Sequence, residues 1–230
     1  MNISIIIPCF NEVLTIEKVI SNVKNYVKSY DYEIIIVDDG STDGTREKLN
    51  NLDKTNIKVC LNEKNFGKGY SVRRGIELSS KEIVLVQDAD LEYDPSDYEK
   101  LLKPIIKNGA DVVFGSRFVG SSEKRVLYFW HRLGNLFLTV LSNMCSNLNL
   151  TDMENGYKVF KKESIKDINL KENRFGFEPE ITAKIAKKNL KIYEVGVKYY
   201  GRKYSEGKKI TWKDGFSALR CIIYYNFFSN

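Results

Sequence analysis

Five short apolar runs recur at fairly even intervals along the first half of the chain, and this spacing most limits how it can fold. The runs are Ile3 to Ile7, Glu33 to Val37, Ile57 to Leu61, Glu82 to Val86 and Asp111 to Phe114. Apolar residues spaced three and four apart lie between some of them, from Ile16 to Val27 and from Tyr98 to Ile105. Short strands that alternate with helices predict an α/β fold with a single, Rossmann-like, mostly parallel sheet flanked by helices. No repeat or linker interrupts the pattern, so we expect one domain over residues 1–230.

An acidic segment, Asp88-Ala89-Asp90-Leu91-Glu92, lies just past the end of the fourth run, after Gln87. Open α/β sheets bind ligands at the carboxyl ends of their strands, where these three carboxylates would meet. Neighbouring carboxylates raise each other's pKa unless a cation lies between them. A hard divalent ion, Mg²⁺ or Mn²⁺, is therefore one interpretation, and it could also hold a diphosphate. The alternative is a polar exit from the strand with a helix cap further on.

Two other loops carry glycine beside polar residues. The second run ends in Asp38-Asp39-Gly40-Ser41-Thr42-Asp43-Gly44-Thr45, and Asn65-Phe66-Gly67-Lys68-Gly69 precedes a predicted helix that contains Val72 and Ile76. Glycines and a lysine at the start of a helix suit an anion, here through Gly67 and Lys68. The spacing excludes a P-loop, and the absence of Gly-x-Gly-x-x-Gly after the first run argues against a dinucleotide-binding domain.

The second half is marked by two amphipathic stripes with large apolar residues. One extends from Val126 to Leu148 and the other from Trp212 to Phe227, preceded by a basic segment from Lys203 to Lys209. Aromatic-rich amphipathic helices beside lysine and arginine fit a peripheral membrane surface. Helices packed on the sheet would give the same spacing, so both interpretations stay open.

Composition narrows the class of protein. The net charge of +6 is not concentrated in one dense block, so nucleic-acid binding is not indicated. Four scattered cysteines and a single histidine, His131, provide no zinc motif and suggest a reducing compartment. We expect no secretory signal and no membrane-spanning helix, because neither a basic leader nor 18 consecutive apolar residues occur. The expected location is the cytoplasm, or the cytoplasmic face of a membrane.

Together, these segments resemble family 2 glycosyltransferases, in particular the dolichol-phosphate mannosyltransferase-like branch. The resemblance covers nearly the whole chain. It rests on Ile5 to Glu12, Ile36 to Thr45, Asn65 to Gly69, Gln87 to Glu92, Gly115 to Phe118, Phe175 to Glu180 and Gly201 to Lys209.

The resemblance implies a GT-A fold, a nucleotide-diphospho-sugar donor and inversion at the anomeric carbon. It divides the chain into a donor-binding half, residues 1–120, and an acceptor and membrane-facing half, residues 121–230. It implies that Asp90 and Glu92 hold Mg²⁺ or Mn²⁺, although the branch often has Gln at the position of Glu92. It further implies that the nucleotide and sugar are lined by Pro8, Phe10, Glu12, Asp39, Asp88 and Ala89.

Positive charge around the phosphates is also implied by the resemblance. The matching positions are Arg117, Arg132 and Arg202, with Lys208 or Lys209 in a loop that closes over the donor, and Asn135 where related enzymes can carry Ser. Guanidinium groups suit this task because they bind phosphate oxygens in pairs and stay charged. Surface ion pairs are the alternative for Arg117 and Arg202, and a place within the amphipathic stripe is the alternative for Arg132.

The acceptor decides which further group is needed. A polyprenyl phosphate is already anionic and needs no general base, whereas a sugar hydroxyl requires one, for which Asp152 and Glu154 are candidates. Asp152 can instead orient the acceptor loop. We therefore expect a metal-dependent hexosyltransferase acting on a polyprenyl phosphate, with a sugar-hydroxyl transferase and a silent sugar-nucleotide-binding module as alternatives. The sugar, the choice of GDP or UDP and the presence of a membrane-anchoring subunit stay open.

Overall fold

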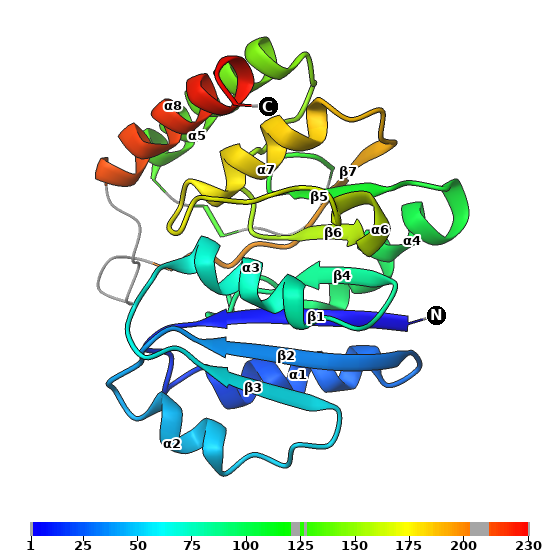
Figure 1. The fold of residues 1–230 in the computed structure, drawn as a ribbon, viewed down its shortest axis with the longest axis vertical. Helices are drawn as coiled ribbons and strands as arrows, with labels where there is room; N and C mark the ends of the chain where they lie inside the picture. Colours follow the sequence, from blue (N-terminus) through cyan, green and yellow to red (C-terminus); the bar gives the residue numbers. More distant parts are fainter. Residues whose placement is uncertain (1, 121–124, 127, 203–211, 230) are drawn as a thin grey trace.

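The computed structural model describes residues 2–120, 125–126, 128–202 and 212–229. Seven strands of this part of the chain form one sheet in the order β3-β2-β1-β4-β6-β5-β7 (Figure 1). The strands are β1 (Asn2–Cys9), β2 (Asp31–Asp38), β3 (Ile57–Leu61), β4 (Ile83–Val86), β5 (Val112–Ser116), β6 (Lys158–Lys161) and β7 (Ile192–Gly196). The helices are α1 (Ile16–Val27), α2 (Thr45–Asn50), α3 (Lys68–Leu78), α4 (Tyr98–Asn108), α5 (Phe129–Ser146), α6 (Lys162–Ile165), α7 (Phe177–Ala186) and α8 (Trp212–Phe227), with a 3-10 turn at Pro95–Asp97.

The sheet is parallel except at β6. Strand β1 pairs in parallel with β2 and β4, while β6 runs antiparallel to both of its neighbours, β4 and β5. The five apolar runs therefore become β1 to β5, and the predicted mostly parallel sheet is confirmed. Strands β6 and β7 were not predicted.

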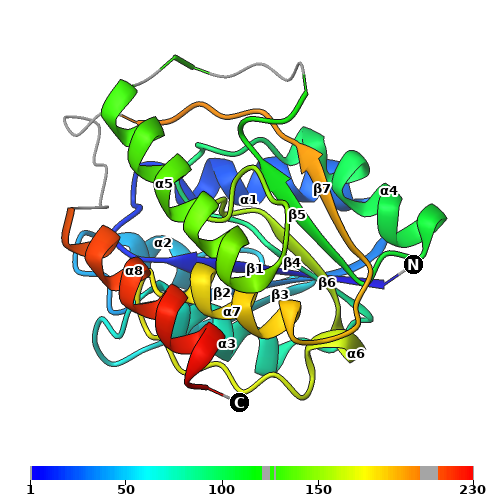
Figure 2. The same cartoon turned by 90° about the horizontal axis from the view of Figure 1, so that it is seen from above.

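Helices cover both faces of the sheet (Figure 2). On one face, Val19 and Val23 of α1 and Leu101 of α4 are buried in the larger apolar core. On the other face, Val72 of α3 and Ile181 of α7 belong to a second core. The predicted spacing in α1 and α4 is thus used to bury apolar side chains against a twisted sheet.

Helices α5 and α8 contact each other and lie outside α7, as an additional layer (Figure 1). In α5 the usual arrangement is reversed, because its fully buried side chains are the polar Thr139 and Ser142. Its large apolar side chains point outward instead. Exposed fractions are 67% for Phe129, 75% for Trp130, 60% for Phe137 and 77% for Met144, and on α8 they are 67% for Phe216 and 63% for Phe227. The structure therefore does not show α5 and α8 simply packed on the sheet through their large apolar side chains.

No helix within the described ranges combines the length and the apolar character required to cross a bilayer.

The parallel arrangement determines where polar loops gather. Strands β1, β2 and β4 run in the same direction, so their carboxyl ends lie side by side, and the loops after Cys9, Asp38 and Val86 gather there. The candidate site lies at these carboxyl ends, as expected for an open α/β sheet.

Candidate active site

A cavity of about 400 Å³ opens at the carboxyl ends of β1, β2 and β4. Most of the residues predicted from the sequence line it. They are Pro8, Phe10, Glu12, Asp39, Gly67, Lys68, Asp88, Ala89, Asp90, Glu92, Arg117 and Arg202. Loops that lie up to 194 positions apart in the sequence thus contribute to one concave surface, a typical form for a small-molecule site.

Asp39 fixes the glycine loop that borders one side of the cavity. Its carboxylate accepts hydrogen bonds from the backbone N–H groups of Phe66 at 3.0 Å and Gly67 at 2.7 Å, and from the Asn62 side chain at 2.8 Å. Gly67 has a φ of +110°, and a Cβ atom there would lie 2.3 Å from the carbonyl oxygen of Asn173. Only glycine allows this close approach of the two loops.

The acidic segment surrounds the guanidinium group of Arg202. Arg202 Nη2 lies 2.9 Å from Asp90 Oδ2, and its Nε lies 3.4 Å from Glu92 Oε1. Its Nη1 lies 3.4 Å from Glu12 Oε1, on the loop after β1. The sequence predicted that Arg202 meets phosphates, whereas in this structure it is the counter-ion of three carboxylates.

Crowding of negative charge changes the titration of Asp90. Burial, together with the charges of Glu92 and Asp88, raises the pKa of Asp90 to about 7, although Arg202 opposes this shift. Oxygen-only side chains that repel one another in this way suit a hard cation.

A second ion network lies beside the first. Lys68 Nζ is 2.8 Å from Asp88 Oδ1 and 3.0 Å from Glu178 Oε1. These two carboxylates raise the pKa of the buried Lys68 well above its usual range, despite the opposing effect of burial. Lys68 therefore stays charged at the start of α3, where the positive end of the helix adds to its attraction for an anion.

Arg117 is held by a buried carboxylate. Its Nε and Nη2 atoms donate to Asp152 at 2.7 and 2.6 Å, and its backbone N–H donates to the same group at 2.9 Å. Asn135 completes the arrangement by accepting from Arg117 Nη2 at 3.1 Å and donating to Asp152 at 3.2 Å. Asp152 is fully buried, and Arg117 holds its pKa below the usual range although burial acts the other way.

Glu154 and Glu178 have a different environment. Each has one buried carboxylate oxygen with no hydrogen-bond partner among the described residues, Oε1 of Glu154 and Oε2 of Glu178. Burial and the charge of Glu178 raise the pKa of Glu154 to about 8. Both residues line the cavity, whereas Asp152 does not, so Glu154 is the predicted candidate base that faces the cavity. With its raised pKa, Glu154 would have to lose a proton before it could act as a base at neutral pH.

Five predicted residues lie elsewhere or cannot be placed. Asp152 and Asn135 are behind Arg117 and do not line the cavity. Arg132 is exposed on α5, with its guanidinium 5.6 Å from the ring of Phe118. Lys208 and Lys209 lie outside the described residues.

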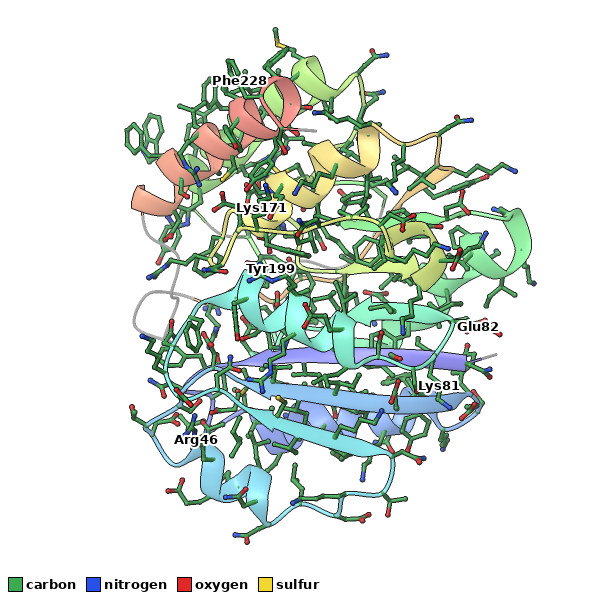
Figure 3. The ribbon with its side chains drawn as sticks, viewed as in Figure 1. Arg46, Lys81, Glu82, Lys171, Tyr199 and Phe228 are labelled. Atoms are coloured by element: carbon green, nitrogen blue, oxygen red, sulfur yellow. The ribbon has the colours of Figure 1, made fainter. Side chains whose placement is uncertain are left out.

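The structure adds lining residues that were not predicted as site residues. Arg174 and Phe175 come from the segment that precedes α7, and Glu178 lies in the first turn of α7. Tyr199, labelled in Figure 3, comes from the segment after β7. Phe175 and Glu178 belong to a segment on which the family resemblance rests, and that resemblance could have identified them as site residues. Tyr199 donates to Glu92 at 3.1 Å and had no signal of its own.

Comparison with known proteins identifies the family. The model of the family described as "Glycosyl transferase family 2" matches residues 4–168. The chain belongs to this family. The predicted resemblance and the predicted enzyme class are confirmed.

Two relatives illustrate the sequence similarity. A dolichol-phosphate mannosyltransferase of Pyrococcus furiosus is 31% identical over 91% of this chain, which spans 61% of that protein. A UDP-N-acetylglucosamine–dolichyl-phosphate N-acetylglucosaminyltransferase of Methanococcus voltae is 32% identical over 94% of this chain and 93% of its own length.

Among solved structures, glucosyl-3-phosphoglycerate synthase from Mycobacterium tuberculosis, in complex with Mn²⁺, UDP and phosphoglyceric acid, has a TM-score of 0.77 at 18% identity. The match covers 98% of this chain and 78% of that one. This likeness, together with the family, confirms the predicted GT-A fold.

Proposed function

We propose that this glycosyltransferase transfers one hexose from a nucleoside-diphospho-sugar to a polyprenyl phosphate, with inversion at the anomeric carbon. The observation that carries the proposal is the meeting of the carboxylates Asp90 and Glu92 with the guanidinium groups of Arg117 and Arg202 in one cavity. Such a site can hold a diphosphate and a second phosphate together. Relatives named for dolichyl phosphate support the same acceptor class.

A divalent cation, Mg²⁺ or Mn²⁺, fits the chemistry of the acidic segment. Among the residues that the structure describes, no three Asp, Glu, His or Cys side chains already form a metal site. Asp90 and Glu92 would supply two ligands, and phosphate oxygens of the donor would complete the set, as is usual for Mg²⁺. When bound, the ion would neutralise charge on the departing diphosphate.

The protein's own side chains would orient the two substrates. Asp39, with Pro8 and Phe10, lines the side of the cavity that we assign to the nucleoside, and Lys68 lies beside Asp88 on the side that we assign to the sugar. Arg117, fixed by Asp152, would hold the acceptor phosphate. Since a phosphate monoester is anionic at neutral pH, its oxygen attacks the anomeric carbon without a base while the bond to the diphosphate breaks.

This assignment gives Asp152 the role of positioning Arg117. We assign donor binding mainly to residues 1–120 and acceptor binding mainly to residues 121–230, with Arg117 at the boundary between the two halves. The acceptor would reach the site from a membrane surface on the cytoplasmic side. Arg132 and Asn135 belong to the acceptor half, on the same helix as the exposed aromatic side chains.

A transfer assay tests the proposal. The purified chain is given GDP- or UDP-hexoses and Mn²⁺, with either a polyprenyl phosphate or a free oligosaccharide, and the released nucleoside diphosphate is measured. We expect release that requires the lipid phosphate. Release only with the oligosaccharide would establish a hydroxyl acceptor, with Glu154 as the first candidate base, and no release with either would indicate a silent binding module.

Substitution of the acidic segment tests the metal assignment. Asp90→Ala should lower kcat/KM by on the order of 10³-fold, because a ligand is lost where charge develops in the transition state. Glu92→Gln should be milder, since an amide oxygen can still coordinate the ion. Full activity of Asp90→Ala in the presence of a chelator would refute the assignment.

A further inference from the structure

The position of Arg202 indicates how the metal and the nucleotide depend on each other. In this structure its guanidinium group contacts the carboxylates of Glu12, Asp90 and Glu92. Two of these are the groups that we assign to the metal. A guanidinium group and a divalent ion that use Asp90 Oδ2 and Glu92 Oε1 cannot occupy the same space.

The contact is well supported by the surrounding structure. The backbone N–H of Arg202 donates to Glu92 Oε1 at 2.8 Å, and that of Tyr200 donates to the Glu92 carbonyl at 2.9 Å. Tyr199 adds its hydroxyl hydrogen bond to Glu92, and it pairs with Tyr93 in an isolated β-bridge. The segment 199–202 is therefore attached to the acidic loop by main-chain and side-chain bonds, which places the guanidinium group among the carboxylates.

The surroundings are also mostly shielded from water. The side chains of Arg202, Asp90 and Glu92 are 18%, 17% and 12% exposed, and that of Glu12 is 7% exposed. Charges in such a site interact more strongly than in water, so displacing one cation by another has a large effect on affinity. Arg202 lowers the local negative charge that would otherwise attract a divalent ion.

We propose that Arg202 acts as an internal counter-ion that makes tight binding of the metal conditional on the nucleoside diphosphate. This inference rests on the proposed function. Without nucleotide, Arg202 competes for the carboxylate oxygens. With nucleotide, the diphosphate offers the guanidinium group new anionic partners, so Asp90 and Glu92 become available to the ion. The two ligands then bind with positive coupling, and by linkage the metal must strengthen nucleotide binding by the same factor.

Direct titration with Mn²⁺ tests this without any turnover. Bound and free Mn²⁺ are measured by electron paramagnetic resonance, with and without GDP or UDP, for the wild-type protein and Arg202→Gln. We expect the wild type to bind Mn²⁺ at least about tenfold more tightly with nucleotide than without it, within the usual range of coupling. Arg202→Gln should bind Mn²⁺ alone about tenfold more tightly than the wild type, and added nucleotide should improve its affinity much less.

Lys81→Gln is the matched control. It removes one positive charge from an ion pair with Asp31, 2.8 Å away, at the amino end of the sheet, where Figure 3 labels Lys81 beside Glu82. Its Mn²⁺ affinity should equal that of the wild type. Arg202→Lys serves as a second variant in case Arg202→Gln does not fold. A single ammonium group cannot bridge three carboxylates, so this variant should bind Mn²⁺ alone more tightly than the wild type.

Failure of this inference and failure of the proposed function would give different results. If Arg202→Gln, or Arg202→Lys in its place, binds Mn²⁺ alone no more tightly than the wild type, the counter-ion role is refuted and the proposed function is unaffected. If the wild type binds no Mn²⁺ even with GDP and UDP present, the metal-dependent function is refuted, and the inference with it.

Discussion

At the scale of single residues, the site is organised by buried carboxylates that hold cations in place. Asp152 fixes Arg117 through two side-chain hydrogen bonds, and Asp88 shares Lys68 with Glu178. Buried ion pairs of this kind add little net stability, but they define geometry, since removing one partner leaves an uncompensated charge. Arg117 and Lys68 are thereby oriented before any substrate arrives.

Glu154 should make the stability of the protein depend on pH. Its pKa is raised from 4.5 to about 8, so the native state holds a proton that the unfolded state releases, and the stability falls as the pH rises from about 4.5 to 8. Glu154→Gln removes this effect. In urea unfolding, the variant should be more stable than the wild type by about 1–3 kcal/mol at pH 8.5, and the difference should shrink towards pH 5.

Glu99→Gln is the control for this prediction, because Glu99 is exposed on α4. It should show no pH-dependent gain. An unchanged stability of Glu154→Gln at pH 8.5 would mean that Glu154 is not kept protonated by its surroundings.

Much of this residue-level site could be predicted because it follows predicted strands. Asp39 and Asp88 each lie two positions after the end of an apolar run, so parallel pairing was enough to bring them together. Glu178 and Tyr199 could not be placed in this way, since each enters from a segment whose position depends on tertiary packing. Arg132 was predicted beside the phosphates, but it is exposed on α5, whereas Asn135, one turn further on, faces Arg117.

At the scale of elements, α5 has two distinct faces. Its polar side chains Asn135, Thr139 and Asn143, each four positions apart, all bond to the segment 150–153. That segment contains Asp152, the partner of Arg117. The opposite face presents exposed apolar side chains. Helix α5 therefore connects an apolar outer surface, through Asp152, to Arg117, which we assign to the acceptor phosphate.

Asn143 tests the polar face of α5. Its Nδ2 donates to the Leu150 carbonyl at 2.7 Å, and its Oδ1 accepts from the Leu150 N–H at 3.0 Å. Asn143→Ala leaves both backbone groups unpaired and should lower the free energy of unfolding by about 1–3 kcal/mol. Met144→Ala, on the outward face with Met144 77% exposed, is the control and should change it by less than about 0.5 kcal/mol. Equal effects of the two substitutions would contradict this account of the helix.

Two strands were missed for identifiable physical reasons. In β6, Lys158 is fully buried, with its ammonium group donating to the carbonyls of Met153 and Asn155. A lysine in a strand of four residues hides the apolar pattern by which strands are recognised. In β7, Ile192–Gly196 lies at the edge of the sheet and is only partly buried, so its sequence shows little of the expected alternation.

At the scale of the whole molecule, the proposed donor site lies at the carboxyl ends of the parallel strands, and α5 and α8 form an outer layer beyond α7 (Figure 1). The sequence predicted both amphipathic stripes but not which side of each helix faces outward. That choice depends on polar partners supplied by residues 150–155, which no periodicity reveals. The resulting layer presents aromatic side chains on a protein with a net charge of +6.

We expect this layer to dock on an anionic bilayer, so that a polyprenyl phosphate can reach Arg117 while its tail stays in the lipid. The wild type should sediment with phosphatidylserine-containing vesicles, and high salt should weaken the binding. Changing both Phe137 and Phe227 to Ser should lower the partition coefficient at least about tenfold, since burying each aromatic side chain contributes about 1.5–3 kcal/mol. Ile106→Ser, at a residue 51% exposed on α4, is the control and should bind like the wild type. A wild-type protein that ignores these vesicles would refute docking through α5 and α8.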